Sequence, residues 1–228
     1  MDVWLDYSLS DFLLFSPETY WRLFEQLNSA IWPFQIVVLA ALVAVVALCL
    51  LGWSRAGLAV GVSLALCWVL VGSIFFEDYY APINWVISSI VPLVWLQAAL
   101  LLLLAPRLDY GPPRRINVLV LAVVVLTLAY PLLSIMDGRP IAQAEMAGFA
   151  PDPTAFLTIG LIGLAQPGWP RAALSVLPCL WLMFSTATLF ALHSSSLSAF
   201  VMVGMAIALL LSATRLGTRW SDLRRGGL

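Results

Sequence analysis

The chain has 228 residues, of which 62% are hydrophobic and only 10% are charged, and its mean hydropathy is +0.99. Because about a quarter of the residues of a soluble domain are charged, this composition excludes an ordinary water-soluble protein and predicts an all-α, polytopic transmembrane helix bundle. All 11 basic residues are arginines, which excludes a lysine Schiff base and with it a retinal-binding rhodopsin. Cys49, Cys67 and Cys179 lie in apolar runs without CxxC spacing, so they indicate neither a disulfide framework nor a zinc site.

Residues 1–30 are expected to form an N-terminal interfacial amphipathic segment. They lack the basic start and the small-residue cleavage site that are typical of a signal peptide. Ser16 is predicted to be a helix N-cap with Pro17 at the first helical position. One side of this helix is apolar and carries Tyr20, Trp21, Leu23, Phe24 and Leu27. We expect it to lie flat outside the first span, as a tether that sets the depth of the bundle or, as a less favoured alternative, as a gating lid.

Residues 31–214 are predicted to form a bundle of seven transmembrane helices, followed by a basic cytoplasmic tail at residues 215–228. A helix needs about 20 apolar residues to cross a bilayer. Six runs approach this length: Ile31–Trp53, Ala56–Phe76, Asn84–Ala105, Ile116–Met136, Ala172–Leu192 and the slightly short Leu197–Ala213. Thr154–Ala165 is too short to cross alone, so it either begins earlier, near Ala147, or is a half-helix.

The charges between these runs predict the orientation. If the fifth run crosses, most arginines fall on one side of the membrane and most carboxylates on the other. The arginines of that side are Arg55, Arg107, Arg114, Arg115, Arg171, Arg215, Arg219, Arg224 and Arg225. Arginine-rich loops stay in the cytoplasm, so we expect the N-terminus outside and the C-terminus inside, in a bacterial inner (plasma) membrane.

Two stretches of the chain are similar to each other. Gly52–Val60 and Gly168–Val176 share a Gly-Trp start and an Arg-Ala pair, and a Cys and a Trp follow each of them. If this match is not a chance one, the bundle has a 3+1+3 arrangement of parallel repeats. Shifting by the repeat would start the fifth span near Ala147 and leave it interrupted at Pro151-Asp152-Pro153.

This interruption is the best candidate for a binding site. Prolines on both sides of Asp152 stop a helix, and we expect Asp152 to be the N-cap of the helix that follows. A break in one of two corresponding helices often marks the binding site of a transporter. The simpler alternative is that Asp152 only caps a short helix at the membrane surface. The predicted site comprises Asp152 and Thr154, together with Asn84 and Gln97 from the third span.

A second candidate is an acidic rim at the outer end of the bundle. It comprises Glu77, Asp78, Asp137 and His193, joined by Glu145 and Asp152. Such a rim could bind a cation, although carboxylates at loop edges are more often simply solvated. Whether a metal binds there is left open. No catalytic motif is present and one histidine cannot build a multi-histidine metal site, so we expect neither an enzyme nor a cofactor.

Three motifs together resemble a bacterial family of uncharacterised membrane proteins, domain-of-unknown-function family 6064. They are Phe15-Ser16-Pro17-Glu18 through Asn28 with Trp32-Pro33, then Ala81-Pro82-Ile83-Asn84, and then Pro151-Asp152-Pro153-Thr154 leading into Phe156-Leu157-Thr158-Ile159-Gly160-Leu161. The resemblance implies a compact polytopic fold and no known activity. The family's third motif is expected to read Pro-Cys-Pro-Thr, so Asp152 in place of the cysteine puts a thiol role in doubt.

These observations favour two functions over a third, an intramembrane enzyme that uses the outer acidic rim with a metal. The first is a carrier or channel-like protein for a small solute or cation, with its site at the broken fifth helix. The alternative is a non-catalytic accessory or scaffold subunit of a larger membrane complex, indicated by the lack of a convincing ionisable residue deep in any span. The expected partners are the lipid bilayer and either other membrane proteins or further copies of the chain. A nucleic-acid partner is not expected, because the basic residues lie in short loops and the tail against a membrane.

Overall fold

The computed structural model describes residues 15–110 and 118–192, together with residues 201 and 204. Within this part of the chain the fold is helical and has no β-strand. The α-helices are α1 (Pro17–Ile31), α2 (Phe34–Leu50), α3 (Ala56–Leu70), α4 (Val86–Leu104), α5 (Val118–Leu128), α6 (Leu133–Met136), α7 (Pro151–Leu164) and α8 (Trp169–Ala191). Between them lie the π-helix η2 (Val71–Tyr80) and the 3₁₀ turns η3 (Ala105–Arg107), η4 (Tyr130–Leu132) and η5 (Ile141–Gln143).

Three helical stretches in the described part are long and apolar enough to cross a membrane. They are Ala56–Tyr80, which joins α3 to η2 without a break, Val86–Arg107, and α8. α1 and α2 together pass the same test, but they are bent by 90° at the break between them. The fold is therefore compatible with a membrane protein. The predicted seventh span, Leu197–Ala213, lies almost entirely outside the described residues, as do His193 and the tail at 215–228.

The N-terminal helix begins where the sequence predicts. Ser16 is the N-cap of α1 and its side chain accepts a hydrogen bond from the Thr19 backbone N–H at 3.3 Å. All five residues of the predicted apolar side are buried. They pack against protein, however, because α1 contacts η5, η2 and α2. Burial against protein, in addition to any membrane surface, therefore holds this helix in place.

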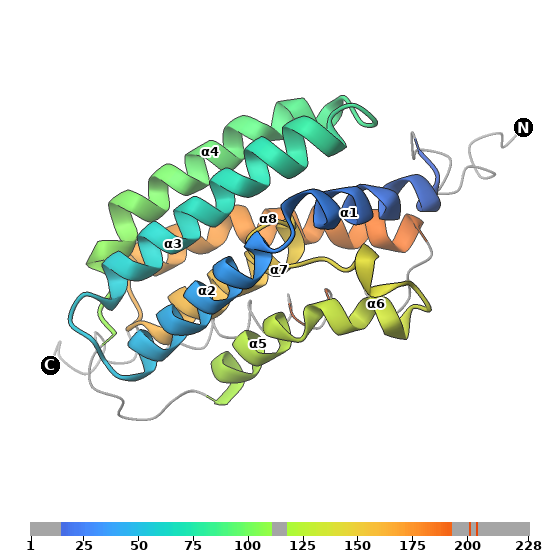
Figure 1. Cartoon of the computed structure of the whole chain (residues 1–228). Helices are drawn as coiled ribbons and strands as arrows, with labels where there is room; N and C mark the ends of the chain where they lie inside the picture. The colour runs from blue at the N-terminus through green and yellow to red at the C-terminus, as the bar shows by residue number, and fades with distance from the viewer. Residues whose placement is uncertain (1–14, 111–117, 193–200, 202–203, 205–228) are drawn as a thin grey trace, which may run out of the picture.

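α3 and α4 form a close pair along one edge of the molecule (Figure 1). Two glycines on α3 make the approach possible. A Cβ atom on Gly57 would lie 2.5 Å from the Ala105 carbonyl oxygen, and one on Gly61 would lie 2.9 Å from the Leu101 carbonyl oxygen. The backbones thus come closer than any side chain on these residues would allow, as expected for a stripe of small residues between apolar helices.

The fourth predicted span, Ile116–Met136, is not one helix in the structure. α5 ends at Leu128, and the chain then passes through η4, which contains Pro131, into the four-residue α6. Proline lacks the N–H that the helix needs and its ring clashes with the preceding turn. Pro131 therefore accounts for the break between α5 and α6.

α7 is the centre of the fold. It contacts α2, α3, α5 and α8, and thirteen of its fourteen residues are buried (Figure 1). The prediction that it begins near Ala147 is wrong, because residues 144–150 form a loop and the helix begins at Pro151. Proline is well placed in the first turn of a helix, where its missing N–H would have no partner in any case.

The two similar stretches do not have the same local structure. Gly52 has a positive φ of 67°, whereas Gly168 is extended with φ −175°. α3 begins four residues after Gly52, whereas α8 begins directly after Gly168 with Pro170 in its first turn. Arg55 is exposed, whereas Arg171 is buried and donates to the Ala165 carbonyl at 3.2 Å. The parallel repeat therefore stays a prediction.

Candidate functional site

A buried carboxylate lies at the start of the central helix. Asp152 is only 1% exposed, and three side chains donate hydrogen bonds to it. They are the Trp181 indole N–H at 2.7 Å and the Ser185 hydroxyl at 2.5 Å, both from α8, and the Tyr130 hydroxyl at 3.3 Å from η4. Donors of this kind stabilise the ionised form of a buried carboxylate.

The prediction that Asp152 is the N-cap of α7 is wrong. The alternative, that Asp152 only caps a short helix at a surface, is wrong as well. The N-cap is Ala150, and the Asp152 side chain crosses to α8 instead. The residue is also not at a surface. The physical reason is that the two prolines begin the helix without a side-chain cap, which leaves the carboxylate free to accept donors from neighbouring helices.

The threonines of α7 satisfy backbone groups near the same place. Thr154 accepts from the Gly148 N–H at 2.8 Å and donates to the Ala150 carbonyl at 2.6 Å, so it holds the preceding loop against the helix. One turn further on, Thr158 accepts from the Trp68 indole at 3.0 Å. Thr154 therefore lies close to Asp152 in the chain but shapes the site rather than facing it.

A second carboxylate, Glu145, is buried in the loop before α7. It is 3% exposed, and neither of its oxygens has a hydrogen-bond partner among the described residues. Burial raises its pKa well above the ordinary value, the charge of Asp152 raises it further, and the charge of Arg139 and the Tyr130 hydroxyl lower it. A buried carboxylate without donors favours its neutral, protonated form.

Arg139 is a cation whose charge acts on Glu145. Its guanidinium lies 3.6 Å from the centre of the Trp21 ring, 3.6 Å from Asp137 and 3.1 Å from the Gln143 carbonyl. Its Nε atom is buried and has no partner among the described residues. Arg139 and Glu145 thus each keep an unused hydrogen-bonding group at the same end of the fold.

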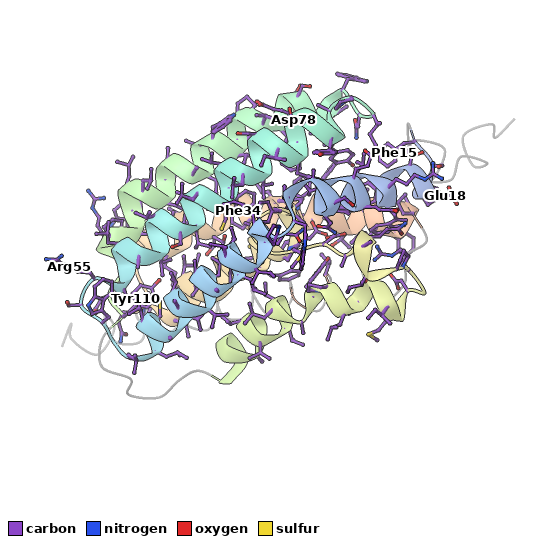
Figure 2. All side chains as sticks on the ribbon, in the orientation of Figure 1. Phe15, Glu18, Phe34, Arg55, Asp78 and Tyr110 are labelled. Carbon is purple, nitrogen blue, oxygen red and sulfur yellow. The ribbon has the colours of Figure 1, made fainter. Side chains whose placement is uncertain are left out.

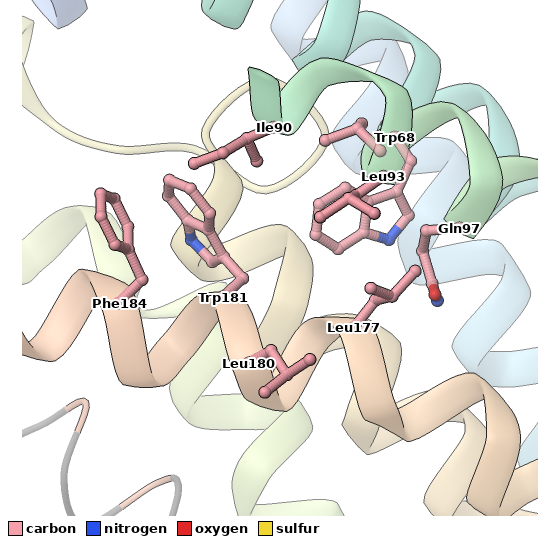
Figure 3. A pocket seen from close by; sticks show the side chains of 9 residues that line it. Trp68, Ile90, Leu93, Gln97, Leu177, Leu180, Trp181 and Phe184 are labelled. Atoms are coloured by element: carbon pink, nitrogen blue, oxygen red, sulfur yellow. The ribbon is translucent and has the colours of Figure 1, made fainter. Parts of the chain in front are cut away.

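An apolar cavity of about 150 Å³ lies between α3, α4 and α8 (Figure 3). Trp68, Trp181 and Gln97 are among the residues that line it. Trp181 joins the cavity to the acidic site, because its ring forms part of the cavity wall while its N–H binds Asp152. The Phe76 ring, on the π-helix η2, packs 5.0 Å from that indole.

Gln97 lies at the opposite end of this cavity from Trp181 and Phe184 (Figure 3). It is fully buried, donates to the Leu174 carbonyl at 3.1 Å, and leaves its Oε1 atom without a partner among the described residues. Asn84 is half-buried in the turn before α4, where its side chain accepts from the Val86 N–H at 3.2 Å. Neither Asn84 nor Gln97 is hydrogen-bonded to Asp152.

The predicted acidic rim is divided by the fold. Glu77 and Asp78 are exposed on η2, Asp137 pairs with Arg139, and Glu145 and Asp152 are buried. Among the described residues, no three His, Cys, Asp or Glu side chains lie close enough together to hold a metal ion. His193 falls outside these residues.

Sequence reasoning placed Glu145 only in the outer acidic rim, and it selected none of Arg139, Tyr130 and Trp181 for the site. Their positions explain this, since they come from the loop before α7, from η4 and from α8, and only the fold brings them together. One signal was available for Ser185, which begins the polar run Ser185-Thr186-Ala187-Thr188 in an apolar helix.

The fold and the site together define a helical protein with a few membrane-length apolar helices around a buried acidic centre. Residues 17–219 match a family described as a family of unknown function, DUF6064. The chain belongs to this family. No curated protein and no solved structure matches the chain.

Proposed function

We propose that this protein is a membrane carrier or channel-like protein for a small solute or cation, with its site at the start of α7. The observation that carries the proposal is Asp152, a carboxylate 1% exposed inside an apolar helical fold and held by donors from two other elements. Ionisable groups buried in apolar helix bundles are costly and usually mark an ion or substrate pathway.

The cavity next to this carboxylate supports the same proposal. It extends from Trp181 towards Gln97, so a movement of the Trp181 ring would change both the cavity wall and the hydrogen bonds of Asp152. Ligand sites of this kind are mostly apolar with a few polar groups that fix orientation.

The orientation we propose has the N-terminus outside and the C-terminus in the cytoplasm, with seven spans in a bacterial inner membrane. The separation of charge supports the direction of the chain, because Arg55 lies at one end of the molecule and Glu18 at the other (Figure 2). A green fluorescent reporter fused after Leu228 should be fluorescent in bacterial cells, and an alkaline phosphatase fused there should be inactive. The reverse pattern contradicts this orientation.

Transport is tested on the full chain reconstituted in liposomes, with solid-supported membrane electrophysiology during rapid changes of pH, of NaCl or KCl, and of a panel of sugars and amino acids. We expect a current with at least one of these probes, lowered at least tenfold by Asp152→Asn. Arg55→Gln, an exposed residue at the other end of the molecule, serves as the control. No current with any probe contradicts the proposal.

The alternative function, an accessory subunit of a larger membrane complex, has a different signature. Purification in a gentle detergent followed by native mass spectrometry would then recover the chain with a stoichiometric partner. Recovery as a lone monomer, together with a current in liposomes, favours the carrier. A homo-oligomer would appear in the same measurement as a multiple of the 24.9 kDa chain.

A further inference from the structure

The two buried carboxylates have opposite surroundings. Asp152 receives three hydrogen bonds, whereas Glu145 is 3% exposed and, among the described residues, has as its only nearby donor the Tyr130 hydroxyl, whose single proton is donated to Asp152. Two carboxylates that lie near each other away from water do not readily ionise together, because each charge opposes the other. The member with the donors is therefore the ionised one, and the member without them is the place for a proton.

We propose that Glu145 is the exchangeable proton site of this protein and that the cation it binds is H⁺. In the state described here, Glu145 is a neutral carboxylic acid and Asp152 is a carboxylate. When Glu145 loses its proton to water, Arg139 takes over as its partner. This inference rests on the proposed function, because it names the cation of the same site.

The charged and titratable groups around Glu145 fit a proton better than a metal ion. They are Asp152 on α7, Arg139 and Asp137 in the loop after α6, Tyr130 on η4, and Tyr20 on α1. The guanidinium of Arg139 would repel a metal ion, and the described residues contain no cluster of three possible ligands. A proton needs only one oxygen and adds no coordination shell.

Arg139 can become the partner of Glu145 once Glu145 has lost its proton. Its contact with Asp137 is long, at 3.6 Å, and its buried Nε has no partner among the described residues. An ionised Glu145 would give that N–H an acceptor, and Asp137, which is only partly buried, would keep contact with solvent. Arg139 can therefore take two arrangements. In one it pairs with Asp137, and in the other its Nε–H donates to an ionised Glu145.

The test is infrared difference spectroscopy on the full chain in lipid, with the carbonyl band of a protonated carboxyl followed as the pH is raised. We expect a band in wild type that is absent in Glu145→Gln and still present in Asp152→Asn. Arg139→Gln should move its titration to higher pH, because Arg139 favours the ionised form. The control Glu18→Gln, a residue on the exposed side of α1, should leave the band unchanged.

The same variants in liposomes loaded with a pH-sensitive dye separate this inference from the proposed function. Glu145→Gln should lower proton entry at least tenfold, whereas Glu18→Gln should leave it at the wild-type rate.

An infrared band that disappears in Asp152→Asn instead, or no band at all, overturns the inference. If Na⁺, K⁺ or a solute crosses but protons neither cross nor couple, the inference fails and the proposed function stands. If nothing crosses while the Glu145 band titrates, the proposed function fails and the proton site remains.

Discussion

At the scale of single residues, hydrogen bonds of two tryptophans hold the central helix. Trp68 and Trp181 approach α7 from α3 and α8, and each donates its indole N–H to a side chain of α7. The two bonds differ in their acceptors, which are a threonine hydroxyl and a carboxylate. A hydrogen bond to a charged group contributes more to stability than one between neutral groups.

Trp181→Phe should therefore cost more than Trp68→Phe. Each change removes the N–H together with the same part of the indole ring, so the difference between the two losses reports the difference between the two hydrogen bonds. We expect the free energy of unfolding to fall by about 1 kcal/mol more for Trp181→Phe than for Trp68→Phe. Reversible unfolding in mixed detergent micelles measures both. Equal losses would mean that Asp152 carries no charge in the folded state.

Gly148 allows the loop before α7 to pack closely against α2. It has φ 94°, and a Cβ atom there would lie 2.7 Å from Val38 Cγ1 on α2. Gly138 also has a positive φ, 73°, but among the described residues no atom beyond its chain neighbours lies within 4 Å of the position a Cβ would take. A comparison of substitutions at the two glycines therefore separates the cost of a left-handed backbone from the cost of a steric clash.

Gly148→Ala should destabilise the protein by about 3 kcal/mol and Gly138→Ala by about 1 kcal/mol, since only the first adds a clash to the cost of the left-handed backbone. Thermal unfolding in detergent, with both variants at equal concentration, provides the comparison. If Gly138→Ala lowers the stability as much as Gly148→Ala does, the backbone conformation alone accounts for both losses.

At the scale of elements, close packing of α3 against α4 forms one wall of the cavity. The pair needs Gly57 and Gly61, because the carbonyl oxygens of Ala105 and Leu101 occupy the space where a side chain would be. Without a hydrophobic force between helices inside a lipid layer, such close contact is the main source of their association.

Gly61→Val should push α3 from α4 and lower the free energy of unfolding by about 2 kcal/mol or more. Leu66→Val, at a position on α3 that is 58% exposed, is the matched control and should change it by less than about 0.5 kcal/mol. Cross-linking of cysteines placed at facing positions of α3 and α4 would report the separation directly. An unchanged cross-linking rate with Gly61→Val would contradict the argument.

At the scale of the whole molecule, the buried acidic centre makes stability depend on pH. Burial raises the pKa of Glu145 above its ordinary value of 4.5, so the folded state holds this proton more tightly than the unfolded chain does. The resulting contribution is fully present below pH 4.5 and is lost as the pH rises through the folded-state pKa.

Glu145→Gln removes this dependence, since an amide cannot lose a proton. We expect the melting temperature of the variant relative to wild type to rise as the pH increases from about 4.5 to 8. Glu18→Gln, the exposed control, should show no comparable rise. A difference that stays constant over this range would mean that Glu145 does not change protonation on folding.

Composition and local pattern alone predicted the all-helical fold, the three long apolar helical stretches Ala56–Tyr80, Val86–Arg107 and α8, and the N-cap of α1 at Ser16. These follow from short-range rules, namely the length of apolar runs and the chemistry of a helix N-terminus. The sequence also singled out Asp152, because two prolines flank a carboxylate. Only the tertiary structure decided what Asp152 does: burial of α7 among four helices turned an expected surface cap into a hydrogen-bonded internal carboxylate. For the same reason, the sequence placed Glu145 only in an outer acidic rim and did not select Arg139, since their chemistry depends on loss of water and on neighbours from distant elements.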